Sequence, residues 1–158
     1  MKRAALVALA LLLPSAADAQ PRQQQQRAAP APADLAQQVS QNLSNCIGQG
    51  RDANLVRSCL DGQRAAIEPR MQAAVQAFYA LQPSADRRTA AEGVQLAWAA
   101  FRDARCAFAG NNPQRGADAV IDLAACLLDF TVSRTMDVEA VIQATSQPPP
   151  PQQAPQRR

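Results

Sequence analysis

Apolar residues recur at steps of three and four through the middle of the chain, a spacing that predicts amphipathic α-helices. The first such run follows Asp34, a favourable N-cap residue, and consists of Leu35, Val39, Leu43, Cys46 and Ile47. Gly48 and Gly50 follow at once and are expected to break this helix. A first short helix that turns back into the next one is therefore predicted.

The second run begins after Asp52 and is longer. Its apolar members are Leu55, Val56, Cys59, Leu60, Ile67, Met71, Val75, Phe78 and Leu81. Pro69 falls inside this run, and proline lacks the backbone N–H that a helix interior uses. Two interpretations stay open: Pro69 kinks one long helix, or it occupies the first turn of a new one. Pro83, Ser84 and Asp86 mark the following loop.

Two more helical runs complete the pattern. Thr89-Ala-Ala-Glu92 has the spacing of a capping box, and Val94, Trp98, Phe101 and Phe108 follow on one side. The segment Gly110-Asn-Asn-Pro113 should end that helix. The last run comprises Val120, Leu123, Leu127, Phe130, Val138, Val141 and Ile142. Because no stretch alternates with period two, we predict an all-α domain of four to five helices.

The amino-acid composition excludes several kinds of catalytic and metal site. The 158-residue chain has no His, and Lys2 is its only lysine. A Ser-His-Asp triad, a Cys-His dyad, an imidazole metal site and a phosphate-binding P-loop are all excluded on these grounds. We therefore expect a binding protein and not an enzyme, with no cofactor and no metal.

The first residues have the pattern of a secretory signal peptide over 1–19. Lys2 and Arg3 precede an apolar segment, 4–13, and Ala17-Asp18-Ala19 is a cleavage site. The ten apolar residues are too few to span a bilayer, which takes about 20. The mature chain is expected to be exported, most simply to a bacterial periplasm, with no stable membrane insertion.

Both ends of the mature chain are rich in Gln and Pro. Residues 20–33 and 146–158 carry no large apolar side chain and are predicted to be disordered tails around a domain at 34–145. That domain has 10 Arg against 12 Asp and Glu, a net charge of −2, whereas the two tails carry four Arg. The basic character therefore lies in the tails, which argues against nucleic acid as a partner.

Four cysteines remain after export, namely Cys46, Cys59, Cys106 and Cys126. In an oxidising compartment they are expected to form two disulfides. A zinc site is disfavoured because the intervals of 12, 46 and 19 residues lack the close pairs that zinc sites use. Three pairings are open, and the most local one joins Cys46 to Cys59 and Cys106 to Cys126.

The local pairing would also set a register between two antiparallel helices. If Cys106 faces Cys126, Trp98 lies opposite Arg134 and Phe101 opposite Thr131. We then expect a cation–π contact between Arg134 and Trp98 and an ion pair between Arg102 and Asp129. Arg102 and its neighbour Asp103 should point apart and have different partners.

These residues also carry a family resemblance. The block Trp98-x-x-Phe101-Arg102-Asp103-x-x-Cys106, followed by Cys126-Leu127 and Thr131-x-x-Arg134, resembles the lysozyme-inhibitor LprI N-terminal domain family. The similarity covers about residues 40 to 142, and Gln95 roughly answers a Gln that members carry near the Trp. It implies a helical, disulfide-linked envelope protein and, for some members, binding and inhibition of host lysozyme. The motif residues themselves are interpreted as scaffold or binding residues.

Three hypotheses for function follow. The first is an inhibitor of lysozyme or another cell-wall hydrolase, whose loop 110–116, with Asn111, Asn112 and Arg115, enters the enzyme's cleft. The same loop could equally be an ordinary helix connection. The second is a non-catalytic structural or adaptor protein of the envelope that uses its tails as tethers. The third, an enzyme with paired carboxylates from Asp103, Asp118, Asp122 and Asp129, has no nucleophile or cofactor site to support it.

Overall fold

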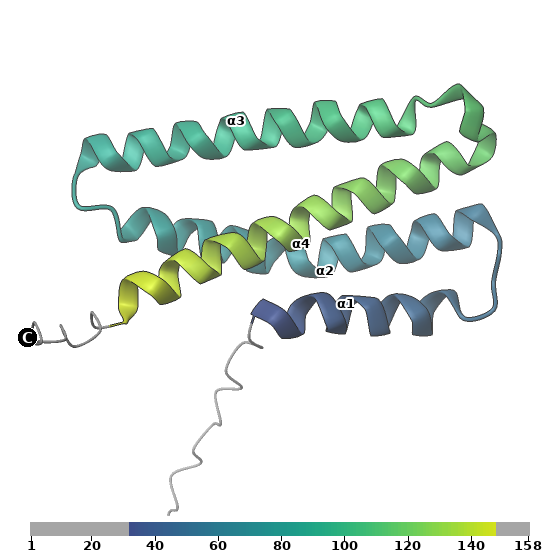
Figure 1. Ribbon diagram of the computed structural model, residues 1–158, viewed down its shortest axis with the longest axis horizontal. Coiled ribbons are helices and arrows are strands. Elements are labelled where there is room, and N and C mark those ends of the chain that lie inside the picture. The colour runs from purple at the N-terminus through teal and green to yellow at the C-terminus, as the bar shows by residue number, and fades with distance from the viewer. Residues whose placement is uncertain (1–31, 148–158) are drawn as a thin grey trace, which may run out of the picture.

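The computed structural model describes residues 32–147, which form four α-helices and one short 3-10 turn (Figure 1). The helices are α1 (Pro32–Ile47), α2 (Ala53–Ala80), α3 (Ala85–Gly110) and α4 (Ala119–Ser146), and the turn η1 (Pro113–Asp118) precedes α4. No strand occurs in this part of the chain, so the predicted all-α class is confirmed. The predicted signal peptide, most of the first tail and residues 148–158 lie outside the described residues.

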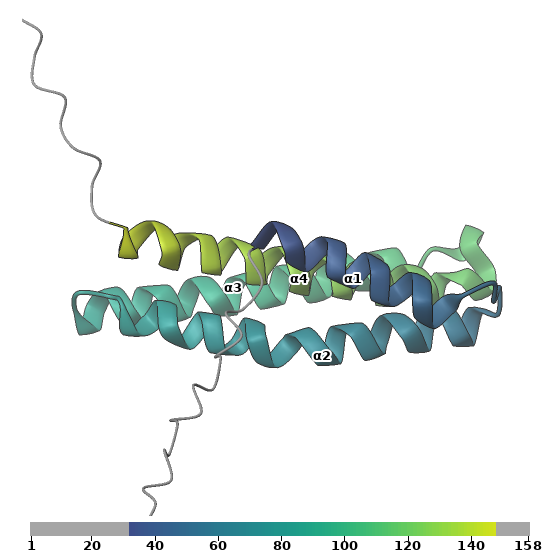
Figure 2. The ribbon, with the colours of Figure 1, turned by 90° about the horizontal axis from the view of Figure 1, so that it is seen from below.

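The helices form two antiparallel hairpins, α1–α2 and α3–α4 (Figure 1). The last helix, α4, contacts all three of the others, and its most extensive contact is with α2. Helices α2 and α4 run in the same direction, and α1 covers only half the length of α2. Figure 2 shows α1 on the same side of the molecule as α4. None of these helices is long and apolar enough to cross a membrane.

The core lies where α1, α2 and α4 meet. It comprises Leu35, Val39, Leu60, Ile67, Ala124, Leu128 and Val132, and a second cluster near the end of α4 comprises Ala74, Val75 and Val138. Arg70 on α2 forms a bidentate ion pair with Glu139 on α4, at 2.6 and 2.7 Å. Both side chains are mostly buried, so this pair holds α2 and α4 in one register.

Two predicted helix starts were wrong. The first helix begins at Pro32, upstream of its predicted N-cap Asp34, which lies instead in the first turn. The third begins at Ala85 because the Ser84 hydroxyl accepts a hydrogen bond from the Arg87 N–H, so the box at 89–92 lies inside the helix. The start of the second helix after Asp52 is confirmed, since this side chain caps the Leu55 N–H at 2.9 Å.

Pro69 neither ends α2 nor starts a new helix. The helix continues from Ala53 to Ala80, and Pro69 lies on its exposed side. Water can therefore bond the carbonyl of Ala65, which loses its helical N–H partner there. Of the two open interpretations, the single long helix is the one observed.

Both disulfides of the local pairing are present. Cys46 is bonded to Cys59 with their Cα atoms 5.9 Å apart, and Cys106 is bonded to Cys126 with a Cα separation of 5.4 Å. Each bond therefore closes one helical hairpin. The turn of the first hairpin uses Gly48 in the left-handed region, at φ +55°, which glycine adopts without steric cost.

Reduction should destabilise the domain strongly. The bonds span 13 and 20 residues, and loops of that size contribute about 3 kcal/mol each by restricting the unfolded chain. For a domain of this size, losing one bond should lower the melting temperature by roughly 10 °C or more. Thermal melts with and without a reducing agent measure this. An unchanged melting temperature would contradict a structural role for the cysteines.

Candidate functional site on the α3–α4 hairpin

The residues that the sequence singled out lie mostly on α3 and α4, around one tryptophan. The guanidinium carbon of Arg134 lies 5.4 Å from the Trp98 ring centroid, and that of Arg102 lies 5.0 Å away. The predicted contact of Arg134 with Trp98 is thereby confirmed. Arg134 also donates two hydrogen bonds to Gln95 Oε1, at 2.9 and 2.7 Å, which fixes its guanidinium across the two helices.

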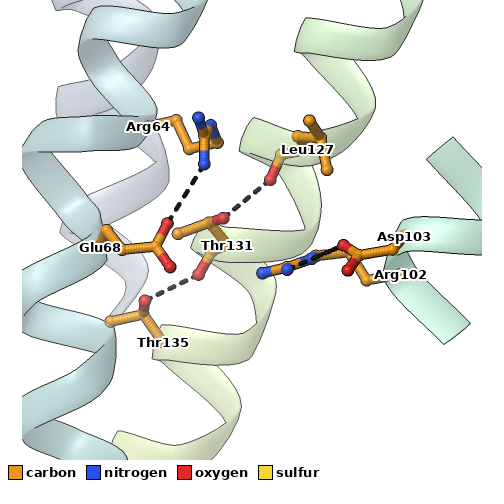
Figure 3. Close-up of polar contacts among 7 residues, drawn as sticks. All are labelled: Arg64, Glu68, Arg102, Asp103, Leu127, Thr131 and Thr135. Carbon is orange, nitrogen blue, oxygen red and sulfur yellow. Dashed lines mark hydrogen bonds and ion pairs between the residues drawn. The ribbon is translucent and has the colours of Figure 1, made fainter. Parts of the chain in front are cut away.

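The predicted ion pair between Arg102 and Asp129 was wrong. Arg102 pairs instead with its neighbour Asp103, at 2.8 Å, so the expectation that these two side chains point apart also fails (Figure 3). The long Arg102 side chain bends over Trp98 and back to the carboxylate, and only 17% of it is exposed. Asp129 cannot compete because it lines a hollow between α1 and α4, away from α3.

Thr131 is a scaffold residue. Its side chain is fully buried, and its hydroxyl donates to the Leu127 carbonyl at 2.8 Å, as Thr135 does to the Thr131 carbonyl at 2.7 Å (Figure 3). Each buried hydroxyl is satisfied within α4, and α4 can therefore pack closely against α2 without losing a hydrogen bond.

Phe101 does not face Thr131 as predicted. It contacts Phe130 edge to face, with ring centroids 5.8 Å apart, and 59% of the residue is exposed. The structure therefore divides the motif by exposure: Trp98, Arg102, Thr131 and Arg134 are buried or half-buried, whereas Phe101 and Asp103 are exposed.

The connection between α3 and α4 is held in one conformation by several short contacts. Asn112 Oδ1 accepts a hydrogen bond from the Gln114 N–H at 3.0 Å, and Gly116 adopts φ +53°. Arg115 donates two hydrogen bonds to the Asp122 carboxylate, from Nε at 2.6 Å and from Nη2 at 3.0 Å. The backbone N–H of Asn111 caps α3 by bonding the Ala107 carbonyl. The loop is thus preorganised although all of its residues are exposed.

A hollow of about 570 Å³ opens beside this loop. Its lining comprises Arg105, Phe108, Ala109, Asn111, Asn112, Pro113, Gln114 and Asp122. Of the three predicted loop residues, Asn111 and Asn112 line this hollow, while Arg115 is bound to its rim through Asp122. Amides, a guanidinium and an aromatic ring together suit contact with another protein. Within residues 32–147 no three potential metal ligands gather at one point.

Three contributors to the site were missed from the sequence. Phe108 was assigned to an apolar helix face, yet 78% of it is exposed beside the hollow. Asp122 was considered as a candidate catalytic carboxylate, whereas here it forms an ion pair with Arg115. Gln95 was noted only as a rough match to a family position. The predicted register places Trp98 opposite Arg134, and Gln95 lies one helical turn before Trp98. This spacing could have indicated the contact between Gln95 and Arg134.

The Arg115–Asp122 pair predicts a measurable titration. Hydrogen bonds from the Arg115 guanidinium lower the pKa of the Asp122 carboxyl below its ordinary value and raise the pKa of Arg115. The pKa of Asp122 is lower in the folded chain than in the unfolded chain. The ion pair therefore stabilises the loop at pH values above the unfolded-state pKa, and this stabilisation is lost as the pH falls through the folded-state pKa.

Side-chain NMR titration of Asp122 measures this shift. Arg115→Ala should raise the Asp122 pKa towards its ordinary value, whereas Arg88→Ala, which removes an exposed arginine at the other end of α3, should leave it unchanged. Equal Asp122 pKa values in the parent chain and in Arg115→Ala would show that the pair does not form in solution.

Comparison with known proteins gives one match. No curated protein and no solved structure matches the chain. A family profile described as lysozyme inhibitor LprI matches residues 46–137, more than half of the sequence. The matched span begins at the first cysteine, includes both disulfides and the Trp98 block, and ends three residues after Arg134. The chain therefore belongs to the lysozyme inhibitor LprI family.

Proposed function

We propose that the mature chain is exported to a bacterial periplasm and inhibits lysozyme, or a related cell-wall hydrolase, by direct contact through the loop 111–116. Family membership supports lysozyme as the target. The pattern of residues 1–19 supports export. The observation that carries the choice of surface is the preorganised loop at the end of the α3–α4 hairpin.

Rigidity is what makes this loop suited to binding. The Cys106–Cys126 bond ties α3 to α4 one turn before the loop begins, and the Arg115–Asp122 pair closes it from the other side. A loop already held in one conformation loses little entropy when it binds. An ordinary flexible connection of the same length would lose more.

The charges of the loop and the domain favour the same target. Lysozymes are commonly basic proteins that cleave glycan with a pair of carboxyl groups in a cleft. The acidic domain would attract such a surface and raise the rate of encounter. Arg115 uses Nε and Nη2 for Asp122, and its Nη1 makes no hydrogen bond within the described residues, so this nitrogen can donate to a carboxylate of the cleft.

The test is a lysozyme assay with cell-wall substrate and the oxidised mature chain. We expect inhibition that saturates with concentration, and heat of binding by calorimetry. Arg115→Ala should weaken inhibition by about tenfold or more, the loss of one well-placed contact, whereas Arg88→Ala, with the same change in charge, should act like the parent chain.

A second variant separates direct contact from loop order. Asp122→Asn breaks the ion pair but keeps the Arg115 guanidinium. If Arg115 touches the enzyme, Asp122→Asn should inhibit better than Arg115→Ala. Equal losses would mean that only the order of the loop matters. Full lysozyme activity at a tenfold molar excess of the parent chain would overturn the proposal itself.

A further inference from the structure

An exposed apolar stripe runs along α3, beside the face that packs on α4, and its middle residue, Phe101, also contacts Phe130 of α4. Val94, Phe101 and Phe108 follow one another at intervals of seven residues, with exposed fractions of 60%, 59% and 78%. Residues seven apart lie on nearly the same side of a helix, drifting by only about 20°. Large apolar side chains exposed in a row are typical of a surface that contacts another protein.

The two ends of the stripe differ in shape. At Val94 there is a small hollow of about 140 Å³, lined by Phe78, Val94, Arg134, Asp137, Val138 and Val141. A cavity of about 150 Å³ accepts a benzene ring, so this hollow matches one aromatic side chain. At the other end Phe108 projects from the surface.

We propose that two copies of this chain pair through the stripe, with their α3 helices antiparallel and Phe101 on the two-fold axis. Phe101 lies midway between Val94 and Phe108, about 10.5 Å along the helix from each. A two-fold rotation about Phe101 therefore brings Phe108 of each copy to the hollow at Val94 of the other. Such self-complementarity is what a closed, isologous dimer requires.

The charges beside the stripe fit the same arrangement. Arg105 lies one turn from Phe108 and lines the same hollow, while Asp137 lines the small hollow at Val94. In the antiparallel pair Arg105 of one copy meets Asp137 of the other, and the symmetry repeats this contact. Neither side chain forms an ion pair among the described residues, so both are available across the interface. A parallel pair would place Arg105 beside Arg105.

The size of the stripe sets the expected strength. Taking roughly 200 Å² for a phenylalanine, the two rings expose about 270 Å² per copy. When Val94, Val141 and the charged pair are added, the area buried on both copies together approaches the roughly 1,000 Å² of a small specific interface. We expect a reversible dimer with a micromolar Kd and a loop 111–116 at each end. This inference does not rest on the proposed function, since it needs no lysozyme.

Sedimentation velocity of the oxidised mature chain between about 1 and 200 µM tests the dimer. The mass should rise to twice that of the monomer across this micromolar range. Phe101→Glu and Phe108→Glu should each raise the Kd by about tenfold or more. Phe108→Glu should keep the helix content and melting temperature of the parent chain because Phe108 is 78% exposed, whereas Phe101→Glu should also lower the melting temperature slightly because it loses the contact with Phe130. Leu96→Glu is the matched control: Leu96 is 73% exposed but lies on the other side of α3, and this variant should dimerise normally.

A charge swap tests the antiparallel register. Arg105→Glu and Asp137→Arg should each weaken the dimer, because each places like charges together, and the double variant should restore it. A dimer that survives Arg105→Glu unchanged would overturn this register. A chain that stays monomeric at about 200 µM would overturn the dimer. If Phe108→Glu then abolished lysozyme inhibition by the monomer, the stripe would be a surface for the enzyme.

Discussion

The packing of α4 against three other helices is the constraint on which the rest of the structure depends. The two disulfides join only helices that are neighbours in sequence, α1 to α2 and α3 to α4. Apart from the backbone connection at 81–84, the hairpins are held against each other by non-covalent contacts, chiefly between α2 and α4. This explains why α4 buries residues along most of its length and why Arg70 and Glu139 pair across it. A substitution that loosens this contact would separate two hairpins that are each still closed.

The position of α3 follows from the same arrangement. Because α3 packs mainly on α4, only Ala91 and Cys106 are buried among its 26 residues. The rest of the α3 surface contributes little to the buried core, so this surface can carry exposed aromatic side chains. The end of α3 leads into the loop at 111–116. The part of the family motif that faces α4 fixes α3 in place, and the outward residues Phe101 and Asp103 belong to the surface. Buried scaffold positions and exposed positions thus lie on two faces of one helix.

The sequence predicted best the contacts that a local covalent bond determines. Pairing Cys106 with Cys126 aligns α3 with α4, and the contact of Trp98 with Arg134 follows. The register between two helices gives the position of each residue along the helix but not the side on which its side chain lies. The predicted Arg102–Asp129 ion pair was therefore wrong, because Asp129 faces α1. The Arg70–Glu139 pair could not be predicted, because α2 and α4 run parallel with no bond near them in sequence. The hollow beside the loop depends on the ion pair between Arg115 and Asp122, and helical spacing cannot predict this pair because Arg115 lies outside the helices.

The two proposed surfaces meet at Phe108, and this limits how they can work together. Phe108 forms one wall of the hollow beside the loop and also one end of the apolar stripe. In the dimer its ring is covered by the second copy, so the polar atoms of Asn111, Gln114 and Arg115 would have to bind the enzyme without it. A dimer with a loop at each end could then hold two enzyme molecules. If the enzyme itself needs the Phe108 ring, the dimer is instead the inactive form, and inhibition becomes less efficient per chain as the protein concentration rises.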